Sequence, residues 1–258
     1  MKYYVVDAFT NKVFQGNPAG VCVLDEILPD TLMQQIAAEH NLSETAFVCR
    51  QEDGYHLRWF TPGFEIDLCG HATLATAFVV FHFLEPDLRE VSFTTVSGTL
   101  TVERKGGLYE MSFPQRLPKR MDVTPEYIGI LGVEPLELYS ERDLYVILES
   151  EQQVRKYIPN YDTWKQLNQW LGIVITAEGE NSDFVSRYFC PELNMEDPVT
   201  GSTHSTLIPL WSRKLNKDKL LAQQVSARGG TLYCKMGIDD VKISGGAVLY
   251  LAGEILKV

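Results

Sequence analysis

The sequence predicts an α+β protein built from two similar α/β halves. Short runs rich in Val, Tyr, Phe and Trp recur along the chain, as is typical of β-strands, and segments of helical periodicity separate them. In addition, residues 58–62 (RWFTP) match residues 187–191 (RYFCP). Each copy is followed by an acidic loop and then by a glycine that begins a helix rich in small residues. This shared order predicts that the chain contains the same structural unit twice.

In the first half, a helix is predicted at residues 30–40, where apolar side chains share one face and Asp30 is expected to be the N-cap. Residues 70–84 are nearly all apolar, and a helix that is apolar on every side is usually buried centrally. Strands are predicted at residues 2–8, 19–24, 46–50, 55–61, 91–96, 98–104 and 108–113.

A polar stretch at residues 114–124 contains two prolines and is interpreted as a linker. Beyond it, helices are predicted at residues 162–171 and 201–215. We therefore expect an N-terminal domain at residues 1–115 and a C-terminal domain from residue 116 onward. Strands in this half are predicted at residues 136–140, 143–149, 173–177, 184–189, 223–226, 231–235, 240–244 and 248–256.

Composition excludes several classes of protein. The 258 residues carry a net charge of −11 with scattered Lys and Arg, which argues against a nucleic-acid partner. The longest apolar run, residues 72–84, is too short to span a bilayer, and the N-terminus runs into strand-like sequence without a signal-peptide pattern. The five cysteines show neither paired nor zinc-type spacing, so we expect a reducing cytoplasm, no disulfide framework and no metal.

Two residues of the first half are candidates for proton chemistry. Glu44 lies where the first helix gives way to a strand, among apolar neighbours, although an exposed turn glutamate fits the sequence as well. His71 follows Gly70 at a predicted helix start, where it would donate to a substrate oxygen. A helix N-terminus should lower the pKa of His71 and favour the neutral ring.

The second half offers a matching set at its repeated helix start. Asp197 lies in a loop that Pro198 restrains, and it could hydrogen-bond a substrate amine or hydroxyl. Gly201 and Ser202 would present backbone N–H groups and a hydroxyl, because helix N-termini attract anions. A small carboxylate would suit two such termini if they faced one cleft. His204 is a weaker candidate.

Cys69 allows a different mechanism. A thiol at a helix start beside His71 could be activated as a thiolate. A racemase with two bases would place a second cysteine in the matching half, but Asp197 and Thr200 lie near that position. A two-thiol mechanism is therefore poorly supported.

The chain resembles the phenazine-biosynthesis isomerase family (PhzF-like proteins), which has the diaminopimelate-epimerase-like fold. The resemblance covers nearly the whole chain and rests on four motifs: residues 7–9 (DAF) with 16–19 (GNPA), 41–45 (NLSET), 70–73 (GHAT) and 196–202 (EDPVTGS). It implies two pseudo-symmetric domains, each a mixed sheet around a central helix, with the final strand, residues 247–258, joining the first domain. The second domain would then end at residue 246.

The resemblance also implies a function and a set of roles. We expect a cofactor-independent isomerase of a small carboxylated metabolite, forming a homodimer, with Glu44 as the base that takes and returns a proton. His71 and Asp197 would assist proton transfer, and Gly70, Gly201 and Ser202 would bind substrate. Two alternatives stay open: an amino-acid racemase or epimerase that uses Cys69, and a non-catalytic small-molecule binding protein.

Overall fold

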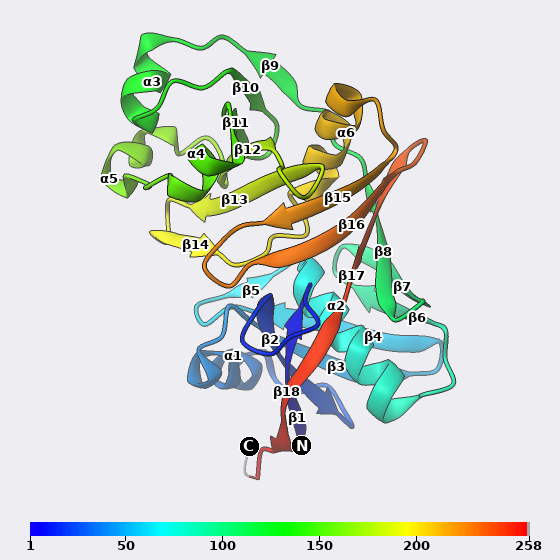
Figure 1. Cartoon of the computed structure of the whole chain (residues 1–258). Coiled ribbons are helices and arrows are strands. Elements are labelled where there is room, and N and C mark those ends of the chain that lie inside the picture. Colours follow the sequence, from blue (N-terminus) through cyan, green and yellow to red (C-terminus); the bar gives the residue numbers. More distant parts are fainter. Residues whose placement is uncertain (257–258) are drawn as a thin grey trace. The chain divides into compact units, whose positions relative to one another are not determined.

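The computed structural model describes residues 1–256, and the chain divides into two compact units (Figure 1). Unit 1 contains Met1–Ser112 and the C-terminal segment that begins at Ile243, whereas unit 2 is Phe113–Lys242. The sequence analysis placed the corresponding boundaries after residues 115 and 246.

Unit 1 is a mixed sheet with helices α1 (Asp30–His40) and α2 (Gly70–Val79), the latter continued by a π-helical segment, η1 (Val80–Leu84). Its strands are β1 (Lys2–Ala8), β2 (Asn17–Leu24), β3 (Glu44–Gln51), β4 (Gly54–Phe60), β5 (Glu65–Ile66), β6 (Glu90–Thr95), β7 (Gly98–Lys105), β8 (Leu108–Pro114) and β18 (Ala247–Glu254).

Helix α2 is the central element of unit 1. Strand β1 pairs antiparallel with both β2 and β18, β2 is parallel to β3, β3 is antiparallel to β4, and β4 is parallel to β6. Strands β6, β7 and β8 continue the sheet as antiparallel neighbours. Every residue of α2 is buried, and the helix packs against β1, β2, β3 and β18. The expectation of a central apolar helix is confirmed.

Unit 2 has one long helix and several short ones. They are α3 (Pro125–Leu131), α4 (Glu151–Lys156), α5 (Tyr161–Trp164), the 3₁₀ turn η2 (Lys165–Leu167) and α6 (His204–Leu215). The strands are β9 (Lys119–Met121), β10 (Glu137–Ser140), β11 (Leu144–Ile147), β12 (Ile173–Glu178), β13 (Phe184–Cys190), β14 (Met195–Asp197), β15 (Lys219–Gln224), β16 (Gly230–Met236) and β17 (Asp240–Gly245), which crosses into unit 1.

The pairing pattern of unit 2 repeats that of unit 1. Strand β10 is antiparallel to β11, β11 is parallel to β12, β12 is antiparallel to β13, β13 is parallel to β15, and β15 is antiparallel to β16. The same alternation runs through β1, β2, β3, β4, β6 and β7. Both units therefore have one topology, as the sequence repeat predicted.

The repeated arginine explains why the motif is preserved in both copies. Arg58 on β4 makes two bonds of 2.7 Å to Glu65 on β5, and its guanidinium lies 5.1 Å from the centre of the Phe60 ring. Arg187 on β13 repeats this with Glu196 at 2.7 and 2.8 Å. These bidentate pairs fix the loop that leads to each buried helix.

The structure corrects three local predictions. Pro29 is the N-cap of α1, and Asp30 lies in the first turn with its carboxylate 2.7 Å from Arg58. The segment interpreted as a linker contains β9, which pairs with β10. Helix α6 begins at His204, because residues 201–203 form a tighter turn before it.

A proline inside α6 is tolerated for an identifiable reason. Pro209 has no N–H, so the carbonyl of Ser205 one turn earlier loses its intrahelical donor. The N–H of Arg116 donates to that carbonyl at 2.9 Å. The segment after β8 thereby satisfies a buried group that the helix cannot satisfy itself.

Candidate functional site

Unit 1 brings Glu44, Cys69 and His71 together. Glu44 is the first residue of β3, whose parallel pairing with β2 sets Ala19 opposite Glu44. Cys69 is the N-cap of α2, and His71 is the second helical residue. Three side chains from separate elements thus meet where the buried helix begins.

Glu44 and His71 form a close pair. The Nε2 atom of His71 lies 3.1 Å from Oε2 of Glu44, and the two side chains are only 6% and 17% exposed. The N–H does not point at that oxygen, so neither atom has a well-aligned hydrogen-bond partner among the described residues. Each of these two atoms therefore has an unused hydrogen bond that a ligand beside the pair could take up.

The other nitrogen of His71 is held by two residues. The side-chain amide nitrogen of Asn17 lies 3.2 Å from Nδ1 of His71, and the sulfur of Cys69 lies 3.5 Å from it. Asn17 is fully buried at the start of β2. The sequence analysis used Asn17 only as a family marker, and the GNPA motif was the signal that could have identified it as a site residue.

The direction of the His71 shift corrects the prediction of a lowered pKa. Burial alone would lower the pKa of His71, but Cys69 and the Glu44 carboxylate raise it well above the ordinary value. Together these two neighbours outweigh burial, so the pKa of His71 lies above its ordinary value although the ring stands at a helix N-terminus.

Cys69 is held as a thiol. Burial raises the pKa of the Cys69 thiol, and Glu44 adds to that shift while His71 opposes it. All five cysteines are free, with Cys69 buried. A buried thiol of raised pKa is a weak nucleophile at neutral pH.

The same three side chains are the candidate donors for a metal ion. One ligand atom each from Glu44, Cys69 and His71 lies within 4.8 Å of the others, and zinc accepts carboxylate, thiolate and imidazole ligands. An ion there would occupy the carboxylate and imidazole edges that proton transfer requires.

Unit 2 brings Asp197, Gly201 and Ser202 close together through the loop after β14. The hydroxyl of Thr200 donates to the Asp197 carboxylate, and the Gln224 side chain bonds the Asp197 carbonyl at 2.8 Å and the Thr200 N–H at 2.9 Å. Gln224 is buried on β15 and therefore shapes this loop. No motif in the sequence pointed to it.

Ser202 has a partner that the sequence analysis also missed. The guanidinium of Arg142 donates from Nη2 to the Ser202 hydroxyl at 3.1 Å. Arg142 lies between β10 and β11, 60 residues earlier in the chain.

His204 contributes to the local fold at the start of α6. Its Nδ1 atom lies 2.9 Å from the Thr200 carbonyl at the start of α6, and burial lowers the pKa of His204 to about 4. The ring is neutral and serves the local fold. That Glu44, His71 and Gly70 share one cleft with Asp197, Gly201 and Ser202 remains a prediction.

Comparison with known proteins gives the family. The PhzC-PhzF profile, described as phenazine biosynthesis-like protein, matches residues 6–253. An uncharacterized isomerase of Pseudomonas aeruginosa is 46% identical over 99% of this chain and 98% of its own length. The chain belongs to the PhzC-PhzF family.

Solved structures agree with this relationship. A putative phenazine biosynthesis PhzC/PhzF protein from Clostridium difficile is 54% identical, with a TM-score of 0.97 and full coverage of both chains. A predicted epimerase from Pseudomonas aeruginosa is 17% identical with a TM-score of 0.77, covering 100% of this chain and 99% of the other, and shows the shared epimerase-like fold. As a PhzC-PhzF protein with three curated relatives named uncharacterized isomerases, the chain is an enzyme of the isomerase class.

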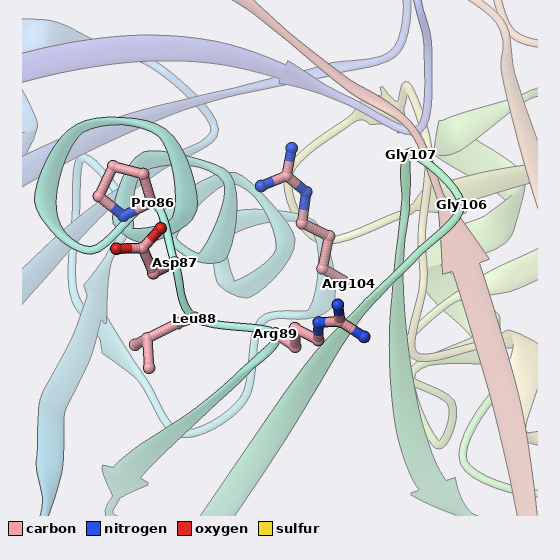
Figure 2. Close-up of a pocket in the computed structure, with 7 residues that line it drawn as sticks. All are labelled: Pro86, Asp87, Leu88, Arg89, Arg104, Gly106 and Gly107. Atoms are coloured by element: carbon pink, nitrogen blue, oxygen red, sulfur yellow. The ribbon is translucent and has the colours of Figure 1, made fainter.

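This PhzC-PhzF protein also has a pocket away from the candidate site. A pocket of about 430 Å³ lies in unit 1 between the turn after η1 and the turn joining β7 to β8, and Arg89 and Arg104 are among its lining residues (Figure 2). It contains none of the predicted site residues. No helix within residues 1–256 combines the length and hydrophobicity needed to cross a membrane.

Proposed function

We propose that the chain is a cofactor-independent isomerase of a small carboxylated metabolite, in which Glu44 carries a proton between two carbons of the substrate. The observation that supports this most directly is the buried Glu44–His71 pair, whose Oε2 and Nε2 atoms lie 3.1 Å apart and have no aligned hydrogen-bond partner among the described residues. A base next to a cation in a site poor in water suits proton abstraction from carbon.

The proposed steps balance within one substrate molecule. The Glu44 carboxylate removes a proton from one carbon, and the electron pair of that C–H bond passes into the conjugated system of the substrate. The protonated Glu44 then returns the proton to a second carbon, which moves the double bond. The His71 imidazolium stabilises the negative charge that develops between the two steps, because its positive charge is buried and fixed.

The remaining predicted residues would bind and orient the substrate. Gly70, Gly201 and Ser202 lie at or just before the N-termini of α2 and α6, where backbone N–H groups favour an anion. Asp197 would orient a polar group of the substrate or relay a proton. These roles follow from the resemblance and from local geometry.

A screen of carboxylated metabolites in heavy water tests this proposal. Proton NMR would report both a new isomer and any deuterium incorporated at carbon. Glu44→Gln should lower the rate by about 10²- to 10⁴-fold, since it keeps the size of the side chain but cannot carry the proton. Glu39→Gln, an exposed glutamate on α1, is the matched control and should retain full activity.

Three outcomes of this screen would contradict the proposal. Near-normal turnover by Glu44→Gln would remove Glu44 from the mechanism. Loss of turnover in EDTA, restored by added zinc, would show that the Glu44, Cys69 and His71 donor set works through a metal. A screen without any turnover would favour a binding protein.

A racemase that uses Cys69 is the second candidate, and the 3.5 Å contact between the Cys69 sulfur and His71 Nδ1 favours it. In that case Cys69→Ser would abolish exchange at an α-carbon while Glu44→Gln would be tolerated. Under the proposed mechanism the results are reversed, and Cys69→Ser should change the rate only mildly because no thiolate is needed.

A further inference from the structure

Unit 2 buries a charged aspartate outside the predicted catalytic set. Asp143 is fully buried just before β11. Its carboxylate accepts bonds from Arg142 Nη2 at 3.1 Å, from the hydroxyls of Tyr145 and Tyr188 at 3.3 and 3.2 Å, and from Thr203 at 3.2 Å. A buried carboxylate is tolerated only with such partners, so these groups hold one another in place.

The two tyrosines remain donors over the physiological pH range. Burial raises the pKa of Tyr145 and of Tyr188, and the Asp143 carboxylate raises both further. Both hydroxyls therefore keep the protons that they donate to Asp143, and the carboxylate is held in place beside Arg142.

Arg142 uses only part of its hydrogen-bonding capacity within the chain. Its Nη2 atom donates to Asp143 and also to the hydroxyl of Ser202, at 3.1 Å each. Nε and Nη1 donate to no residue in the described part of the chain, and the side chain is 26% exposed. A positive group with unused donors thus stands beside a residue that was predicted from sequence to bind substrate.

We infer that Arg142 binds the carboxylate of the substrate beside Ser202, with Asp143 as the residue that positions the guanidinium. Arginine is suited to this role because its planar fork matches a carboxylate with two parallel bonds. A chain with a net charge of −11 also needs a local cation to attract an anion. That the bound anion is the carboxylate of the substrate rests on the proposed function.

The alternative is that Arg142 only neutralises Asp143. The two explanations differ in what happens when a free carboxylate is added. A guanidinium with available donors should bind it, whereas one that serves only as a counter-ion should not.

The test titrates the intact protein, labelled with ¹⁵N-arginine, with sodium benzoate at constant ionic strength. The Arg142 Nε–H resonance is identified by its absence from Arg142→Lys, and that of Arg104 by its absence from Arg104→Lys. Arg104 is the matched control because it forms no ion pair within residues 1–256 and lies in unit 1. The Arg142 resonance should shift saturably with benzoate and not with the neutral isostere benzamide. An unmoved Arg142 resonance, or equal shifts at both arginines, would overturn the inference.

Affinity gives a second readout. Benzoate should raise the thermal unfolding midpoint of the wild type and of Arg104→Lys equally. Arg142→Lys keeps the positive charge opposite Asp143 but loses the fork, so benzoate should bind about 10- to 100-fold more weakly. Asp143→Asn should weaken binding as well, and adding it to Arg142→Lys should have no further effect if Asp143 acts through Arg142. Unchanged affinity in Arg142→Lys would contradict the inference.

Failure of this inference and failure of the proposed function are distinguishable. Glu44→Gln should bind benzoate normally whether or not the protein turns over a metabolite. If the protein isomerises its substrate normally but the Arg142 resonance does not respond to benzoate, the proposed function is retained and Arg142 is excluded from carboxylate recognition.

Discussion

At the scale of single residues, two buried histidines show how neighbours decide charge. His71 has a carboxylate 3.1 Å away and a raised pKa, whereas His204 lies between the Thr200 carbonyl and the Phe184 ring and has a pKa lowered to about 4 by burial. Both rings lie near the start of a buried helix. The same residue type therefore has a raised pKa in one unit and a lowered pKa in the other.

The pairing of His71 with Glu44 should make stability depend on pH. The pKa of His71 is higher in the folded protein than in the unfolded chain, where it is about 6.5. The pairing therefore stabilises the fold fully below about pH 6.5, and this stabilisation is lost as the pH rises through the pKa of the folded state. His71→Gln should lower the free energy of unfolding by about 3 kcal/mol at pH 6 and by clearly less at alkaline pH. Urea denaturation at both pH values checks this; a difference that grows with pH would contradict it.

His204 should produce the opposite dependence. Its folded pKa of about 4 lies below the ordinary 6.5, so the neutral ring favours folding above pH 6.5 and the advantage is lost as pH falls toward 4. Between pH 6.5 and pH 4, protonation of His204 should lower the free energy of unfolding of the wild type by up to roughly 3 kcal/mol. His204→Asn keeps a donor near the Thr200 carbonyl but cannot ionise. Its acid unfolding curve should therefore be shallower, and identical curves would refute the assignment.

At the scale of elements, the loop between β1 and β2 places Asn17 against His71. Gly16 in this loop has a φ of +67°, and a Cβ there would lie 2.1 Å from the Ala8 carbonyl oxygen. No side chain fits without moving the main chain, so the loop geometry depends on glycine.

Gly16→Ala should therefore reduce both stability and activity. We expect the free energy of unfolding to fall by more than about 2 kcal/mol, because the main chain would have to move. Turnover should fall as well, because Asn17 would move away from His71 Nδ1. Gly106→Ala is the matched control: its φ is +57°, but a Cβ would meet nothing within 4 Å, so it should cost only about 1 kcal/mol and leave activity unchanged. Equal losses in the two variants, measured by denaturation and by turnover, would exclude a special role for the Gly16 loop.

Short helices were the elements that the sequence analysis missed. Helix α3 begins at Pro125, a favourable helix start in which the Thr124 hydroxyl accepts from the Tyr127 N–H, yet the polar stretch just before it, residues 114–124, was interpreted only as a linker. Helix α4 spans only Glu151–Lys156. Segments of six or seven residues carry too few apolar positions for periodicity to identify them.

At the scale of the whole molecule, we expect a homodimer, as the family resemblance implies. Two-fold dimers are the commonest oligomers of soluble proteins. Light scattering at micromolar concentration should give about 58 kDa, twice the 29.2 kDa of one chain. A mass near 29 kDa across the micromolar range would contradict this expectation.

The sequence by itself determined the α+β class, the repeat of one unit and the identity of Glu44 and His71 as candidates. These are encoded locally, because strand and helix periodicity and short motifs occupy neighbouring positions in the chain. The RWFTP and RYFCP motifs even identified the strand whose arginine fixes each loop.

Only the tertiary structure decided which groups surround those candidates. Asn17 reaches His71 across 54 residues of sequence, and Arg142 reaches Ser202 across 60, because strand pairing brings distant segments together. The raised pKa of His71 has two causes: Cys69, which is a neighbour in the sequence, and the Glu44 carboxylate, which lies 3.1 Å away and which only the tertiary structure brings there.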